Sequence, residues 1–292
     1  MVCAATLWSI AGVFTRHLDT VHGFEITFWR SLFTAIFVAA TLVLQQKSSV
    51  FAKVRAVGTI GLLSGFFWGI MFSCFMMALT MTTVANTLVV DSVAPFLTVL
   101  LSWIFLKQRT SLRTWFAISL ASLGILWMFI GSMAEFGSQH LAGMAVALVV
   151  PIAAASNFVI LKKIGHDTDL VPTVLIGALF SACLMLPLAL PLSASAHDIL
   201  MMAILGVFQL GLPCILLVRA SRYLSAPEIS LLAMLEIILG PFWTWLGAGE
   251  VPSPATLIGG AFVLAALIWN ELAMLRQAKL MEKVCSAESR AG

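Results

Sequence analysis

Long apolar stretches follow one another along most of this chain, and they constrain its fold more than any other feature. A helix needs about 20 apolar residues to cross the hydrocarbon core of a lipid bilayer. By that measure the sequence predicts an all-α integral membrane protein with ten transmembrane helices. The predicted spans cover residues 2–16, 24–44, 57–79, 83–106, 113–131, 141–161, 170–192, 198–219, 226–247 and 254–275.

Composition excludes the other broad classes of protein. Hydrophobic residues make up 61% of the 292 residues and charged residues only 10%, whereas a soluble domain carries about a quarter charged residues. A disordered chain is excluded too, because disorder needs low hydrophobicity and high net charge. The 5 cysteines are scattered, without the spacing of a metal site or of a disulfide framework. We therefore expect neither a metal nor another cofactor.

The basic residues between the spans indicate which way the helices point. Of the 16 lysines and arginines, all but Arg16 and Arg30 fall in alternate turns or in the C-terminal tail. Cytoplasmic loops of membrane proteins are enriched in Lys and Arg. The pattern predicts a multi-pass protein of the cell's inner membrane with both termini in the cytoplasm, and residues 277–292 as a cytoplasmic tail.

The ten spans divide into two groups of five. A repeat with an odd number of spans ends on the opposite side of the membrane, so the second copy must have the inverted orientation. Shifting the chain by 142 residues superposes Gly69 on Gly211 and Trp103 on Trp245, although such identities are sparse. The same shift places the basic turn at 107–113 on a turn without basic residues. This exchange of charge predicts two inverted repeats, residues 1–137 and 138–276, as in many secondary transporters. The alternative is an even-numbered bundle with accidental similarity.

Several short motifs occur in an order that is characteristic of one transporter family. They are Leu7-Trp8-Ser9, Phe28-Trp29-Arg30-Ser31, Val93-Ala94-Pro95-Phe96, Ala154-Ala155-Ser156-Asn157-Phe158, Leu235-Glu236-Ile237 and Gly249-Glu250. In their order and spacing the chain resembles the ten-helix EamA branch of the drug/metabolite transporter (DMT) superfamily, over nearly its whole length. It is most similar to the amino-acid exporters of the YddG type. The Glu-Pro usual in helix 9 of that family is Glu236-Ile237 here.

The resemblance implies a function and an architecture. It implies a monomeric secondary transporter that exports small amphipathic metabolites, such as neutral or aromatic amino acids, by alternating access of its two halves. Helices 1, 3, 4, 6, 8 and 9 would line the cavity, and helices 5 and 10 would be peripheral. Two alternatives stay open: a proton-coupled exporter of cationic drugs, and a membrane scaffold that transports nothing.

Three ionisable residues lie deep within the predicted spans, where charge is costly and marks candidate functional sites: Arg30, Asp91 and Glu236. Arg30 and Asp91 lie roughly 9 Å and 12 Å from the outer ends of their helices at the usual helical rise. We therefore expect a possible Arg30–Asp91 ion pair, structural or functional. Glu236 lies near the bilayer centre, where burial favours the neutral carboxyl group. It is the candidate for proton coupling, the alternative being a protonated side chain bonded to the backbone.

Uncharged polar and aromatic side chains complete the candidate substrate site. The polar candidates are Ser9, Asn86, Asn157 and Gln209, which could instead form hydrogen bonds between helices. The aromatic candidates are Trp8, Trp68, Phe72 and Trp243, which could instead serve packing or face lipid. Candidate hinges are the helix-interrupting residues Gly69, Pro95, Gly211, Pro213 and Pro241, with ordinary packing kinks as the alternative.

Motifs of other functional classes are missing from the sequence. It contains no nucleotide-binding GxxxxGK[ST] motif, no HExxH and no GxSxG. We therefore predict that the protein is not an enzyme, has no catalytic residues and is not driven by ATP bound to this chain. It also lacks a basic region in the context of a nucleic-acid-binding fold. The expected partners are a small-molecule substrate, the lipid bilayer and, in the proton-coupled alternative, protons.

Overall fold

The computed structural model describes most of the chain from residue 1 to residue 272. The undescribed positions are 19–21, 46–49, 107–111, 113–115, 117, 118, 121, 122, 125, 128, 129, 132–137, 165–169, 221–225, 267, 270, 271 and 273–292. All the regular structure among the described residues is helical, which confirms the predicted all-α fold. Six helical stretches there are long and apolar enough to cross a membrane, beside shorter apolar helices at Val2–Arg16 and Pro254–Ala266.

The first half of the chain supplies seven labelled helices. They are α1 (Val2–Ser9), α2 (Ala11–Arg16), α3 (Gly23–Gln45), α4 (Val50–Ala56), α5 (Gly58–Met81), α6 (Val84–Asp91) and α7 (Ala94–Leu106). The first predicted span is therefore divided into α1 and α2 at Ile10, and the fourth into α6 and α7. Most of the fifth predicted span lies outside the described residues.

The second half has a similar composition of long helices. Its elements are α9 (Ser138–Ile164), α10 (Val171–Ala189), α11 (Ala196–Ile204), the π-helix η1 (Leu205–Gly211), α12 (Leu212–Ala220) and α13 (Ala226–Ala248). A further helix covers residues 254–266. The eighth predicted span is one continuous helical rod made of α11, η1 and α12, whose start is fixed by a capping box between Ser195 and Asp198.

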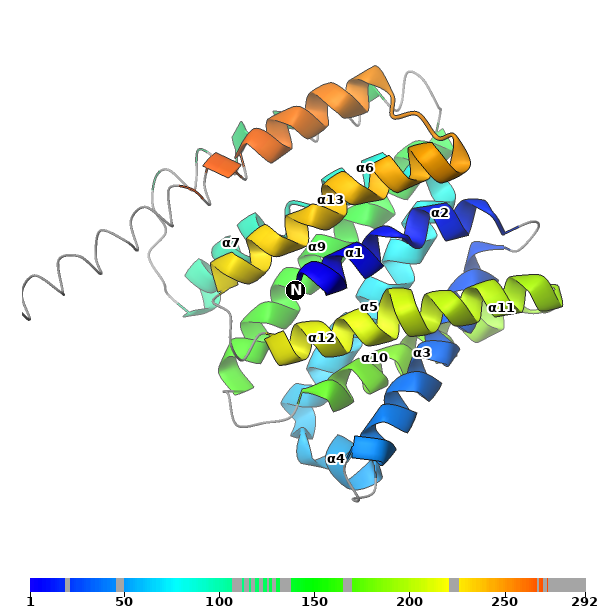
Figure 1. The fold of residues 1–292 in the computed structure, drawn as a ribbon. Helices are drawn as coiled ribbons and strands as arrows, with labels where there is room; N and C mark the ends of the chain where they lie inside the picture. Colours follow the sequence, from blue (N-terminus) through cyan, green and yellow to red (C-terminus); the bar gives the residue numbers. More distant parts are fainter. Residues whose placement is uncertain are drawn as a thin grey trace, which may run out of the picture.

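The helices pack side by side into one bundle (Figure 1). The short helix α1 lies between α13 on one side and η1 and α12 on the other. Behind them α3, α5 and α10 pack on one another, and α5 also packs along α9. Consequently α1 connects α13 to η1 and α12, η1 also packs on α3, and the candidate site lies around these contacts.

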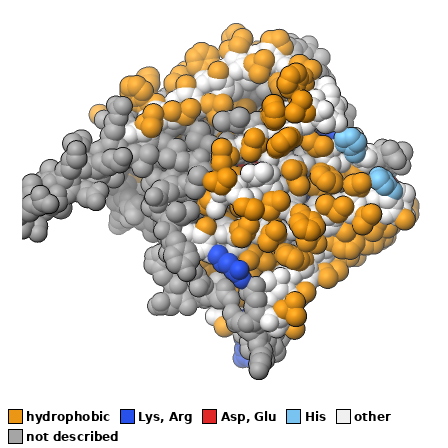
Figure 2. Space-filling model, in the orientation of Figure 1, with side chains coloured by type: hydrophobic (Ala, Val, Ile, Leu, Met, Phe, Trp, Pro, Cys, Tyr) orange, Lys and Arg blue, Asp and Glu red, His pale blue; other side chains and the backbone are white. Residues whose placement is uncertain are grey.

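The outer surface of the bundle is apolar and its interior carries polar groups. Figure 2 shows a face covered mostly by hydrophobic side chains. Leu44, Phe105, Leu257 and Trp269, for example, are more than half exposed. Meanwhile several polar side chains are fully buried, including Arg30 and Gln209. A soluble protein would not leave such an extensive apolar surface in water, so this distribution is that of a protein surrounded by lipid.

Candidate functional site

A polar stripe on α3 brings the most deeply buried charge into the interior. The stripe consists of Thr27, Arg30, Ser31 and Thr34, all with 0% exposure. Their spacing of three or four residues puts them on one face of the helix. The Thr27 hydroxyl donates a hydrogen bond to the carbonyl of Gly23 in its own helix. Arg30 and Ser31 instead reach neighbouring helices, so this face of α3 connects elements from both halves of the chain.

The Arg30 guanidinium is held by neutral groups. Its Nη1 donates to Gln209 Oε1 at 3.0 Å, and its Nη2 donates to the backbone carbonyl of Phe72 at 2.8 Å. Its Nε is buried and has no hydrogen-bond partner among the described residues. The guanidinium therefore keeps its positive charge inside the bundle, together with an Nε donor that none of these residues uses.

The π-helix η1 supplies Gln209 to this site. Pro213 follows shortly after η1 and has no amide hydrogen to donate to the carbonyl four residues earlier, that of Gln209. Such interruptions favour a local π-turn, which often occurs at functional sites. Gln209 is buried and bridges two elements, because it accepts from Arg30 and its Nε2 donates to the Trp8 carbonyl at 3.4 Å.

Close contact between α3 and η1 depends on glycine. A Cβ at Gly206 would lie 2.6 Å from the Arg30 carbonyl oxygen and 3.1 Å from the Thr34 nitrogen. The Thr34 hydroxyl also donates to the Gly206 carbonyl at 2.8 Å. Since the backbones meet here without a side chain between them, Arg30 comes within hydrogen-bonding distance of Gln209.

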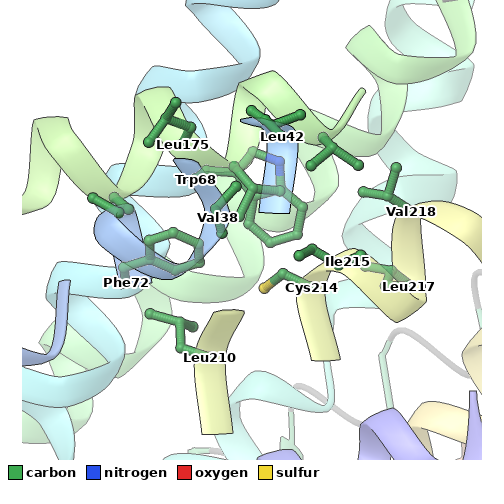
Figure 3. Close-up of a cluster of buried hydrophobic side chains, with 14 residues drawn as sticks. Val38, Leu42, Trp68, Phe72, Leu175, Leu210, Cys214, Ile215, Leu217 and Val218 are labelled. Carbon is green, nitrogen blue, oxygen red and sulfur yellow. The ribbon is translucent and has the colours of Figure 1, made fainter. Parts of the chain in front are cut away.

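Two of the predicted aromatic residues lie beside Arg30, in a buried cluster. Trp68 and Phe72 are each 3% exposed, and their ring centroids are 5.5 Å apart. Figure 3 shows them among the side chains of Val38, Leu210 and Cys214. Trp8 packs against the same cluster from α1. Among the described residues, the buried Trp68 Nε1 has no hydrogen-bond partner.

The expected Arg30–Asp91 ion pair is not formed in this structure. Arg30 donates to Gln209 and Phe72 instead, although the similar predicted depths of Arg30 and Asp91 in the membrane are compatible with an ion pair. Asp91 is the last residue of α6, and its buried Oδ1 has no hydrogen-bond partner in the part of the chain that the structure describes. The helix ends there because Pro95 cannot donate to the Asp91 carbonyl four residues earlier. The neighbouring charge is Glu236 on α13, which packs on α6.

Cys214 relates the two charged regions to each other. It is 1% exposed and lies within electrostatic range of both the Arg30 guanidinium and the Glu236 carboxyl group. The sequence analysis did not single out this position. The interior holds a positive group at Arg30 and carboxyl groups at Glu236 and Asp91, and Cys214 lies near Arg30 and Glu236.

The other polar candidates already have partners among the helices. Asn157 on α9 accepts from Ser64 on α5 at 2.6 Å. Asn86 on α6 accepts from Thr256, and its side-chain amide also donates to Thr82. The Ser9 hydroxyl donates a hydrogen bond to the carbonyl of Thr6 within α1. In this structure Asn86 and Asn157 join helices, which was the alternative interpretation of both.

Trp243 does not line the interior. Its side chain is 36% exposed on α13 and packs against Phe242, with ring centroids 5.4 Å apart. The opposite face of α13 carries the buried Thr244, and there a Cβ at Gly240 would contact Leu88. Thr244 and Gly240 are four positions apart and therefore share this buried face of α13. Trp243 lies off that face and belongs to the lipid-facing surface.

The predicted hinge residues lie at two kinds of place. Pro95 and Pro213 coincide with real helix interruptions, between α6 and α7 and after η1. Pro241, in contrast, lies inside continuous α13. Gly69 and Gly211 are positions of close packing: a Cβ would lie 2.4 Å from the Phe180 ring at Gly69 and 2.7 Å from the Phe37 ring at Gly211. Their role in motion stays a prediction.

One ionic cluster joins the two halves of the chain at an end of the bundle. Arg16 Nε donates to Glu250 Oε2 at 2.7 Å, and its other nitrogens donate to the carbonyls of Leu79 and Thr82. Glu250 Oε1 in turn accepts from the backbone nitrogen of Val84 at 2.7 Å. Gly249, with φ of +67°, ends α13 and turns the chain toward this cluster.

A buried serine cluster was also missed from the sequence. The hydroxyl groups of Ser31 and Ser73 each lie 2.9 Å from that of Ser181, so α3, α5 and α10 are joined at one point. The signal was present in the helical spacing of Thr27, Arg30, Ser31 and Thr34, which marks one polar face of α3. No comparable signal identifies the partner serines.

The profile of the EamA-like transporter family matches residues 1–130 and 141–271 of this chain. One solved crystal structure covers 92% of the chain and 95% of its own length with a TM-score of 0.63. At 18% sequence identity that likeness shows the shared fold alone.

Three relatives illustrate what similar chains do. Solute carrier family 35 member G1 of Homo sapiens is 25% identical over 90% of this chain and 75% of its own. A pseudopaline exporter of Pseudomonas aeruginosa is 23% identical over 91% of this chain and 93% of its own. An S-adenosylmethionine uptake transporter of Rickettsia prowazekii is 22% identical over 89% and 87%. All three are transporters rather than enzymes.

Proposed function

Since the chain belongs to the EamA-like transporter family, we propose that it is a secondary transporter that exports small amphipathic metabolites, in particular neutral or aromatic amino acids. It is a multi-pass membrane protein, and we place it as a monomer in a bacterial inner membrane with both termini in the cytoplasm. The observation that carries the proposal is the Arg30–Gln209 site beside buried aromatic rings. Polar groups at that depth are costly and mark substrate pathways.

Alternating access is the mechanism that we propose, with residues 1–137 and 138–276 as the two moving halves. The two separate stretches matched by the family profile support this division. The Arg16–Glu250 cluster joins the halves at the end that we place outside the cytoplasm. Because its bonds are non-covalent and partly exposed, they can open and close during a transport cycle. In this structure the cluster is formed.

The substrate class rests on the site and on the relatives together. The Arg30 guanidinium suits a carboxylate, and the Trp8, Trp68 and Phe72 side chains suit an apolar body. One relative is named for S-adenosylmethionine, which contains the amino acid methionine, and another for an exported metabolite. The direction of transport in this chain is proposed from its resemblance to exporters.

Flux into liposomes that contain the purified protein tests the proposal. Radiolabelled neutral and aromatic amino acids would be supplied beside one cationic dye, with and without an imposed pH gradient. We expect saturable amino-acid flux. If no amino acid moves while the dye does, the proposed substrate class is wrong.

A second candidate is a proton-coupled exporter of cationic drugs, and one observation favours it. Asp91 is not neutralised by Arg30, so two carboxyl groups, Asp91 and Glu236, are available to a cation or a proton. Dye movement only with a pH gradient would support this candidate. Glu236→Gln, which cannot bind and release a proton, would then abolish gradient-driven flux while leaving substrate counterflow intact. Unchanged gradient-driven flux would exclude a coupling role for Glu236.

A further inference from the structure

Two buried charged groups in the interior have hydrogen-bonding capacity that the described residues do not use. Arg30 Nε is a donor without an acceptor, and Asp91 Oδ1 is an acceptor without a donor. Buried polar groups in folded proteins are nearly always paired, and an unpaired one calls for an explanation. Here the unused donor, Arg30 Nε, belongs to a positively charged group, and the unused acceptor, Asp91 Oδ1, belongs to a carboxyl group. The two groups are therefore chemically complementary.

These two groups do not satisfy each other. Arg30 is bonded to Gln209 and Phe72, on η1 and α5. Asp91 lies near Glu236, a like charge, at the contact of α6 with α13. Two neighbouring carboxylates repel each other and are stabilised by a cation. The opposite charges are thus held apart by the protein, in an arrangement that a simple structural ion pair would not need.

The separation is spanned by side chains that suit a small molecule. Cys214 lies within electrostatic range of both Arg30 and Glu236, and Trp8 packs from α1 against the cluster that contains Cys214. Helix α1 packs on η1 and α12 at the positive side and on α13 at the negative side (Figure 1). Trp8 and Cys214 therefore lie in the same region of the bundle as the Arg30 guanidinium and the Glu236 carboxyl group.

We propose that this region binds a zwitterion in a fixed orientation, with its carboxylate on Arg30 and its ammonium group on Asp91 and Glu236. The inference rests on the proposed transport function and specifies its substrate class. Arg30 Nε supplies the charge-assisted bond that the carboxylate needs. Asp91 Oδ1 accepts from the ammonium group. A substrate that lacks either charge leaves one side of the site unpaired, and such sites reject the incomplete analogue strongly.

The first test compares complete and incomplete ligands on the wild-type protein in liposomes. Flux of labelled phenylalanine would be competed by unlabelled phenylalanine, by 3-phenylpropionate, which lacks the amine, and by phenethylamine, which lacks the carboxylate. Leucine, 4-methylpentanoate and 3-methylbutylamine form a second set. We expect each incomplete analogue to compete at least about tenfold more weakly than the amino acid, as for sites with an unpaired buried group.

Isosteric variants then assign the negative side. In Glu236→Gln and Asp91→Asn we expect weaker amino-acid competition and little change for the amine-free analogues, so that the preference for the amine shrinks. Glu25→Gln is the matched control, because its buried carboxylate holds the backbone of Ser193 and Ala194 instead. That variant should keep the full preference for the amine. These readouts do not require any variant of Arg30, whose removal could unfold the protein.

The possible outcomes separate this inference from the proposed function. If phenylalanine or leucine moves but its amine-free or carboxylate-free analogue competes equally well, the inference is wrong and amino-acid transport stands. The inference is also wrong if Glu236→Gln and Asp91→Asn both discriminate as the wild type does. If neither amino acid moves while the cationic dye does, both the inference and the proposed substrate class are overturned.

Discussion

A buried guanidinium requires hydrogen-bond acceptors for its N–H groups, and the acceptors of Arg30 among the described residues are both neutral. The Gln209 side chain and the Phe72 carbonyl reduce the cost of burial without cancelling the charge. A carboxylate in their place would have produced a closed, neutral pair. At the scale of single residues, the interior is therefore prepared to receive a negative group, and Gln209 is the residue that maintains this state.

Gln209→Met should weaken the fold measurably. Methionine fills a similar volume but cannot accept from Arg30, so the guanidinium keeps a single partner among the described residues. We expect a loss of about 1–2 kcal/mol in the free energy of unfolding, in the range for bonds to charged groups and for bonds inside membrane proteins. Chemical unfolding in mixed micelles measures it.

The matched control for this experiment is Thr41→Val. Thr41 also lies on α3, but its hydroxyl donates only to the carbonyl of Phe37 in its own helix. Its replacement should change stability by less than about 0.5 kcal/mol, because such local bonds are not needed by the helix. Equal losses in the two variants would mean that the Arg30–Gln209 bond contributes nothing specific.

Ser181→Ala should also cost stability. The alanine leaves the hydroxyl groups of both Ser31 and Ser73 without their shared partner at the junction of α3, α5 and α10. We expect a loss of about 1 kcal/mol in the free energy of unfolding. Ser156→Ala, which removes a hydroxyl bonded only to its own helix at Ile152, is the control and should be nearly neutral. A neutral Ser181→Ala would contradict the cluster's structural role.

Residue-level partners were the least predictable part of the site. Depth could be read from the sequence, and it allowed Arg30 to meet Asp91. The choice of Gln209 instead depends on the rotation of α3 about its axis and on the π-turn that Pro213 favours. The exposed position of Trp243 was hard to predict for a similar reason, since an apolar helix surrounded by lipid has no polar face to mark its inward side.

At the scale of elements, prolines position two of the interior polar residues. Pro95 and Pro213 each follow a polar residue by four positions, Asp91 and Gln209, and each removes the amide that would bond that residue's carbonyl. One helix ends at Asp91, and the other changes to a π-turn that contains Gln209. The number and type of long helices could be predicted, because length and hydropathy determine them. The exact form of each interruption depends on neighbouring helices and could not.

Gly206→Ala should disturb the contact between α3 and η1. The new Cβ would lie 2.6 Å from the Arg30 carbonyl, which is backbone and cannot rotate away. The helices must separate, so we expect a loss of about 1–3 kcal/mol in the free energy of unfolding, as for other overpacked sites. Substrate flux should fall as well, because Arg30 then moves away from Gln209.

Gly260→Ala provides the matched comparison for Gly206→Ala. The same substitution there meets only the Val89 side chain, at 3.2 Å. A side chain can yield by a few tenths of an ångström, so stability and flux should stay close to those of the wild type. If the two alanine variants behave alike, close backbone contact at Gly206 is not what positions Arg30.

At the scale of the whole molecule, the halves pack along several long helices, and one polar contact between them lies at an end of the bundle. The Arg16–Glu250 cluster joins residues that are 234 positions apart in the sequence. The sequence alone could not pair these two residues, because loop charges carry no information about partners. A rigid-body rocking of the halves has to break this cluster whenever that end opens.

Locking that end should stop transport. In a protein whose 5 native cysteines are replaced by alanine, Arg16→Cys and Glu250→Cys would be joined across the halves by a reducible thiol cross-linker. We expect flux to fall more than about tenfold on cross-linking and to return on reduction, because a covalent bond removes one of the two states that alternating access requires. The control joins Arg16→Cys to Thr82→Cys, since Arg16 contacts the Thr82 carbonyl within the first half. That cross-link should leave flux unchanged.

If the two cross-links inhibit flux equally, local distortion at Arg16 is the cause. If flux stays complete while residues 16 and 250 are cross-linked, the two halves do not separate at this end.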